Sequence, residues 1–70
     1  MIVDVYGFTQ NFTAGILKGM VIADNQLTFG SKKDAMAWFE GVNKNNEIGE
    51  CDYFVTDFEK LGVTEIGVTV

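Results

Sequence analysis

The chain has 70 residues, of which ten are acidic, five are lysine and none is arginine or histidine, so its formal net charge is −5. A single cysteine excludes an intrachain disulfide and a thiolate zinc cluster, and the lack of histidine removes the usual general base near neutral pH. Because nucleic-acid recognition depends on arginine and on basic surfaces, we expect no direct binding of nucleic acid.

The first part of the chain predicts two or three strands. Residues 2–9 (IVDVYGFT) alternate and are rich in β-branched and aromatic side chains, as in a strand. A loop is expected at residues 10–15 and a second strand at residues 16–23. Turn-forming residues at 24–26 then precede a short third strand at 27–29.

A helix over residues 32–43 is the best-marked element. Ser31 is a favourable N-cap, and Asp34 can complete a capping box three residues later. An apolar stripe at helical spacing follows, formed by Ala35, Trp38, Phe39 and Val42. We therefore expect Trp38 or Phe39 to be largely buried against the sheet, and the polar residues 43–46 to end the helix.

The remaining residues predict two more strands, at 50–58 and 63–70, joined by a tight connection at 59–62. The element order ββ(β)αββ indicates a single α+β domain over residues 1–70. In this fold class, one helix packs on one face of a mainly antiparallel sheet, which here has four or five strands.

Alternation divides the strand residues between two faces, and charged positions indicate which face points outward. The inward set is predicted to be Val3, Val5, Leu17, Val21, Cys51, Tyr53, Val55, Ile66 and Val68. The outward face then mixes acids with aromatic rings, and exposed apolar patches of this kind commonly mark contact sites. Its candidate partner-binding residues are Asp4, Tyr6, Phe8, Glu50, Asp52, Phe54 and Glu65.

Carboxylates are the only groups in this sequence with catalytic potential. Glu50 and Asp52 share a strand face, but a catalytic pair also needs a concave site, which a small sheet with one helix is not expected to offer. Together with Glu47 they lack the ligand pattern of a calcium loop. We therefore expect no enzyme activity, no metal site and no cofactor.

The acidic charge favours a protein partner with a basic surface, because the field of the chain steers it toward positive charge. The alternative is that the charge only keeps a small protein soluble. Neither a secretory signal nor a membrane-spanning segment is recognisable, so we expect a cytoplasmic protein without a membrane partner.

Residues 29–41 (FGSKKDAMAWFEG) resemble the strand-to-helix junction of small phage-encoded anti-CRISPR proteins that inhibit type I-F surveillance complexes. The resemblance rests on the spacing of Phe29, Ser31, Trp38, Phe39 and Gly41. It implies an inhibitor that acts by stoichiometric binding in the host cytoplasm. These positions are structural, so the resemblance carries over no partner-contacting residue.

Two functions follow from these observations. The first is a phage-type inhibitor or regulator that binds a host defence or nucleic-acid-handling protein through an acidic and aromatic sheet face. The second is a homodimeric accessory or structural module whose exposed sheet faces pair, with a small ligand sequestered between the subunits as a variant of it.

Overall fold

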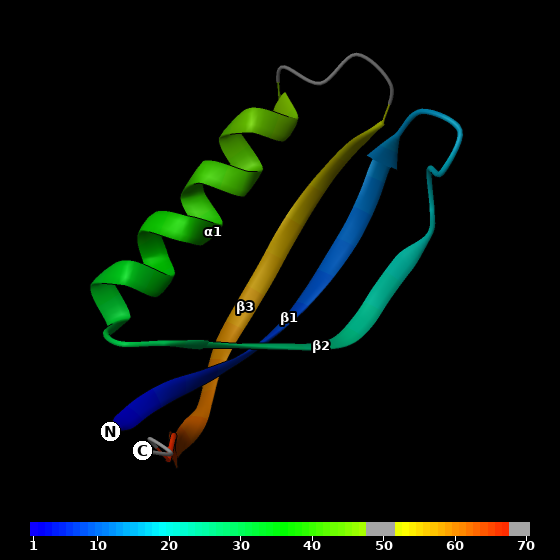
Figure 1. Ribbon diagram of the computed structural model, residues 1–70. Helices are drawn as coiled ribbons and strands as arrows, with labels where there is room; N and C mark the ends of the chain where they lie inside the picture. Colours follow the sequence, from blue (N-terminus) through cyan, green and yellow to red (C-terminus); the bar gives the residue numbers. More distant parts are fainter. Residues whose placement is uncertain (48–51, 68–70) are drawn as a thin grey trace.

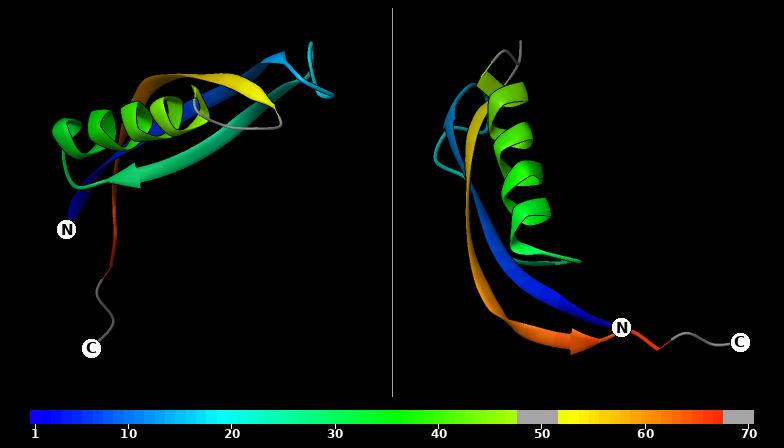
Figure 2. Two further views of the ribbon diagram at one scale, coloured as in Figure 1. Left: turned by 90° about the horizontal axis from the view of Figure 1, so that it is seen from above. Right: turned by 90° about the vertical axis from the view of Figure 1, so that its left-hand side faces the viewer.

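A computed structural model describes residues 1–47 and 52–67 of the chain (Figure 1). Its elements, in chain order, are β1 (Ile2–Ala14), β2 (Val21–Phe29), α1 (Lys32–Glu47) and β3 (Tyr53–Glu65). The strands form an antiparallel sheet in the order β2-β1-β3, and α1 lies along one face of it (Figure 2). The predicted α+β class with one helix on one face is therefore confirmed.

The predicted number and order of strands are wrong, because the described residues form three strands in the order ββαβ. The expected loop at 10–15 mostly belongs to β1, where Gln10 and Asn11 pair with residues of both neighbouring strands. The expected connection at 59–62 lies inside β3, where one extra residue, Leu61, is accommodated as a β-bulge. Pairing with distant residues thus overrides the local turn signals.

β2 merges the two short strands that were expected on either side of residues 24–26. Asp24 adopts a left-handed conformation (φ 62°) at a shift in the β1–β2 register, between the pairs Phe8–Asn25 and Gln10–Ile22. Aspartate tolerates this conformation better than most residues. The turn signal therefore produces a bulge within a strand, and the turn that joins β1 to β2 lies earlier in the chain.

The helix begins as predicted, but it continues past residue 43 to Glu47. The hydroxyl Oγ of Ser31 accepts a hydrogen bond from the Asp34 N–H at 3.2 Å, which confirms the N-cap. The polar run at 43–46 forms the last turns of α1. Its function is to tie the helix to the sheet.

Two asparagines make this tie at the outer edge of β3. Asn43 donates from Nδ2 to the Thr56 carbonyl at 3.2 Å, and its Oδ1 accepts from the Thr56 N–H at 2.7 Å. Asn46 donates from Nδ2 to the Phe54 carbonyl. An edge strand exposes unpaired backbone groups, so these side chains satisfy part of the β3 edge that no other strand covers.

The core is a small aromatic cluster between α1 and the sheet. Phe39, with 0% of its surface exposed, stacks on Phe58 with ring centroids 4.2 Å apart and planes at 9°. Tyr6 and Ala35 are also buried, and Phe8 and Phe29 pack against them. The expectation that Trp38 or Phe39 is buried is confirmed by Phe39, whereas Trp38 stays 42% exposed.

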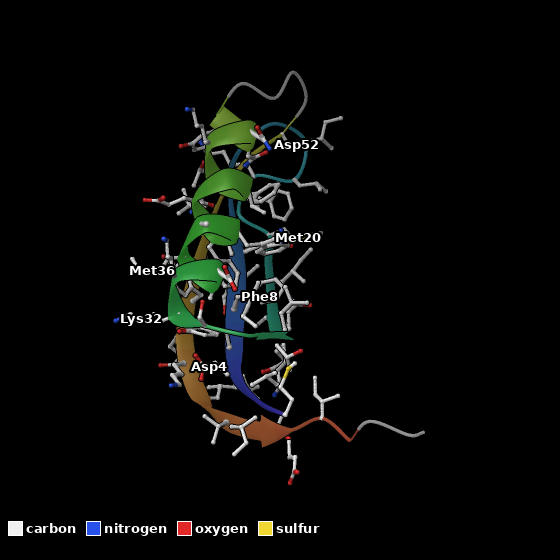
Figure 3. The ribbon with its side chains drawn as sticks, turned by 60° about the vertical axis from the view of Figure 1, so that its left-hand side comes forward. Asp4, Phe8, Met20, Lys32, Met36 and Asp52 are labelled. Atoms are coloured by element: carbon white, nitrogen blue, oxygen red, sulfur yellow. The ribbon has the colours of Figure 1, made fainter. Side chains whose placement is uncertain are left out.

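The predicted orientation of β1 is wrong for Tyr6 and Phe8, although Val3, which was predicted to face inward, is buried. Tyr6 is 2% exposed and lies under α1, and Phe8 lies between α1 and the sheet, in contact with Trp38 and Phe39 (Figure 3). The error came from taking Asp4 as a marker of the outer face. Asp4 lies opposite Phe29 on the helix side, where Lys60 neutralises its carboxylate at 3.1 Å.

Candidate protein-binding face

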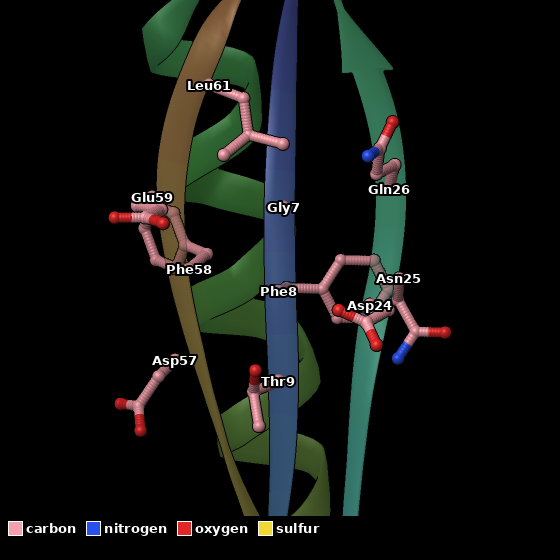
Figure 4. A pocket seen from close by; sticks show the side chains of 10 residues that line it. All are labelled: Gly7, Phe8, Thr9, Asp24, Asn25, Gln26, Asp57, Phe58, Glu59 and Leu61. Carbon is pink, nitrogen blue, oxygen red and sulfur yellow. The ribbon is translucent and has the colours of Figure 1, made fainter.

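The face of the sheet that α1 leaves uncovered, called the open face below, carries a hollow of about 340 Å³ (Figure 4). All three strands contribute to it. Its lining residues are Gly7, Phe8, Thr9, Asp24, Asn25, Gln26, Asp57, Phe58, Glu59 and Leu61.

The hollow exists because the middle of β1 has no side chain at one position. Gly7 pairs with Gln26 of β2 and Glu59 of β3, and their side chains rise on either side of it. The bulge residue Leu61 leans over the same position, so a Cβ atom added at Gly7 would lie 3.0 Å from Leu61 Cδ1. Glycine in a strand interior often marks such a close approach.

The charged residues that line the hollow are all acidic. Three carboxylates line it, from Asp24, Asp57 and Glu59, and none of the five lysines does. One oxygen of Asp57 accepts a hydrogen bond from Asn11 Nδ2 at 3.1 Å. The lysines lie elsewhere: three are in the range of α1, Lys60 is paired with Asp4 on the helix side, and Lys18 is in the β1–β2 turn.

This arrangement suits a long basic side chain. In the described parts of the chain, no three carboxylate or thiol groups converge closely enough to hold a metal ion. Lysine and arginine side chains bury their aliphatic stems on apolar surface while the charged head stays near polar groups. Leu61 supplies the apolar surface here, and the three carboxylates supply the negative charge.

The aromatic residues of the predicted site lie on the helix side of the sheet. Tyr6 is in the core, and Phe54 packs on Phe12 of β1 with ring centroids 5.1 Å apart. Only Phe8 reaches the hollow, as part of its lining. Predicting an aromatic open face was therefore wrong, because the aromatic rings are needed to build the core.

The acidic residues of the predicted site do not come together. Asp4 is ion-paired with Lys60, and the part-buried Asp52 accepts a hydrogen bond from the Leu17 N–H at 3.2 Å. Glu65 is exposed at the end of β3, and Glu50 lies outside the described residues. The candidate site thus contains different acids.

Sequence reasoning missed Asp24, Asp57 and Glu59 as members of one surface. The alternation of side chains along β3 could have indicated this, because Asp57 and Glu59 lie on the opposite face of the strand from Thr56 and Phe58. The apolar and buried members of that alternation face α1, so the acids must face away from it.

In the described segments, the helix is too short and too polar to cross a membrane.

Comparison with protein-family models, with curated proteins and with solved structures finds no match to this chain.

Proposed function

We propose that the chain is a small acidic inhibitor or regulator of the phage type, which binds a host defence or nucleic-acid-handling protein stoichiometrically through its open face. One observation carries the proposal: three acidic residues are among those that line a hollow on an uncovered sheet face, and no lysine lines it. The resemblance of residues 29–41 to anti-CRISPR proteins supports the phage type, and these residues form the junction from β2 into α1.

In this mechanism the open face receives basic side chains that the partner otherwise uses to hold phosphate groups. Opposite charge accelerates encounter and fixes orientation, whereas buried apolar contacts usually give most of the affinity. Leu61, which is 51% exposed beside the carboxylates, supplies the apolar contact.

The test is a charge reversal with a matched control. The immobilised chain is incubated with a lysate of the cells in which it is naturally expressed, and the retained protein is identified and titrated by surface plasmon resonance. We expect Glu59→Lys to slow association about tenfold at low salt and to weaken its salt dependence. Glu40→Lys changes the net charge equally but lies on α1, and should leave the rate within about twofold.

Both variants should remain folded, because exposed charges contribute little to stability. Equal losses of rate in Glu59→Lys and Glu40→Lys would mean that only net charge matters and that the open face is not the site.

Filling the hollow tests its shape independently of charge. A methyl group at Gly7 meets the far end of the half-exposed Leu61 side chain, which can move, so Gly7→Ala should change stability by less than about 1 kcal/mol. Binding of the retained protein should weaken severalfold, because the new methyl group occupies the floor of the hollow.

Gly41→Ala is the matched control for this variant. Nothing lies within 4 Å of a Cβ at that helical position, so the variant should bind normally and gain up to about 1 kcal/mol in stability. Normal binding by Gly7→Ala would show that the hollow does not receive a partner side chain.

A homodimeric accessory module is the second candidate. α1 packs more closely on β3 than on β2, and the apolar side chains of Val21 and Ile22 on β2 are exposed. Light scattering separates the candidates, since a tight dimer would double the mass of 7.7 kDa.

A further inference from the structure

The turn that joins β1 to β2, called the tip loop below, comprises residues 15–20 and lies at the end of the sheet away from the N-terminus (Figure 1). Its Ile16 side chain is 96% exposed, the highest value among the large apolar side chains in the described residues. Leaving a whole isoleucine in water is unfavourable, and burying it is worth as much as burying other large aliphatic side chains. Met20 of the same loop is 46% exposed and Val21, which follows it, is 57% exposed, and grouped exposed apolar side chains of this kind commonly mark a contact site.

The tip loop is built as a fixed structure. Gly15 and Gly19 have φ angles of 87° and 90°, which other residues adopt only with strain. Backbone hydrogen bonds close the turn, donated from Lys18 N to Gly15 O at 3.3 Å, Met20 N to Leu17 O at 2.9 Å, Gly19 N to Phe12 O at 2.9 Å and Phe12 N to Met20 O at 3.0 Å.

A side chain from a distant part of the sequence also holds the loop. Asp52, which directly precedes β3, accepts a hydrogen bond on Oδ1 from the N–H of Leu17, the residue next to Ile16. This bond is part-buried and joins residues 35 positions apart. A loop held in its bound shape loses less conformational entropy on association, so its contacts yield more affinity.

We propose that the tip loop is an anchor that inserts Ile16 into an apolar pocket of the partner protein, and that Asp52 is the positioning residue that keeps the loop in shape. The inference rests on the proposed function for the existence of a protein partner, and it adds a second contact site beyond the open face. Interfaces of this kind depend on a few deeply inserted side chains surrounded by weaker contacts.

A protein pocket fits the tip loop better than a lipid surface does. Peripheral membrane binding combines apolar side chains with clustered basic residues that attract anionic lipids. The tip loop has one lysine, Lys18, in a chain of net charge −5. Anionic membranes would therefore repel the molecule as a whole.

The test uses the retained protein from the capture experiment and two pairs of matched variants. Ile16→Ala should weaken binding more than about tenfold, mainly through faster dissociation. Ile2→Ala removes the same atoms from another exposed isoleucine, near the opposite end of the sheet, and should leave binding unchanged. Asp52→Ala should weaken binding, whereas Asp52→Asn should preserve it because its amide oxygen accepts the same hydrogen bond.

Amide hydrogen exchange of Leu17, measured by NMR on the free protein, gives a readout that is separate from binding. Exchange should accelerate in Asp52→Ala and stay near the parent rate in Asp52→Asn. Equal loss of binding in both Asp52 variants, with unchanged exchange at Leu17, would show that the charge matters and would overturn the positioning role.

Wild-type binding by Ile16→Ala would overturn the anchor. The wild-type chain is also tested for flotation with phosphatidylcholine–phosphatidylglycerol vesicles. Flotation that is lost in Ile16→Ala would overturn the protein anchor in favour of a membrane contact. Loss of binding in Ile16→Ala but not in Glu59→Lys would support the anchor and refute the open face as the binding site. Loss of binding in Glu59→Lys but not in Ile16→Ala would support the open face and refute the anchor. If the wild-type chain retains no protein, the proposed function and the anchor both fail.

Discussion

Replacing Phe39 by alanine is expected to destabilise the protein by about 3–5 kcal/mol, enough to unfold a domain of marginal stability. Phe39 is fully buried, stacks on Phe58 and has ring contacts with Tyr6, Phe8 and Phe29. A core this small cannot collapse around the missing ring. Circular dichroism should show Phe39→Ala largely unfolded near room temperature.

Trp38→Ala is the control for this prediction. The two aromatic residues are adjacent in α1, but Trp38 is 42% exposed and covers the edge of the cluster, near Phe8 and Phe29. Its loss should therefore lower the melting temperature less than the loss of Phe39. A melting temperature for Phe39→Ala within a few degrees of the parent would mean that the helix does not pack on the sheet as described.

Replacing Asn43 by alanine is expected to cost about 2–4 kcal/mol, because it removes two hydrogen bonds and leaves the backbone of a buried residue without partners. The affected groups are the N–H and the carbonyl of Thr56 at the outer edge of β3. Urea unfolding should show a lower midpoint. The uncovered strand edge should also make the variant more prone to aggregation.

Asn45→Ala is the matched control, since Asn45 is exposed two residues further along α1. Alanine is the better helix former, so this variant should be neutral or slightly more stable. Equal midpoints for the two variants would show that Asn43 contributes only its helix propensity and does not tie α1 to β3.

At the start of α1 and along its apolar stripe, the structure depends on residues close together in the chain, and the sequence predicted it correctly. Ser31 and Asp34 lie within one turn of each other, so the helix start could be read from their spacing, and Phe39 could be placed in the core from the apolar stripe around it. Composition alone likewise shows that no histidine or arginine side chain contributes to any site of this chain.

Only the tertiary structure decided which side of each strand faces the helix. Alternation sorts residues into two sets but does not say which set is covered, and Asp4 could lie on the helix side because Lys60, 56 positions later, pairs with it. In the same way, cross-strand pairing turned the expected turns into bulges at Asp24 and Leu61. The candidate site depends on both outcomes, since its carboxylates come from strands that are distant in sequence and line one hollow beside Gly7 and Thr9 only after the sheet has formed.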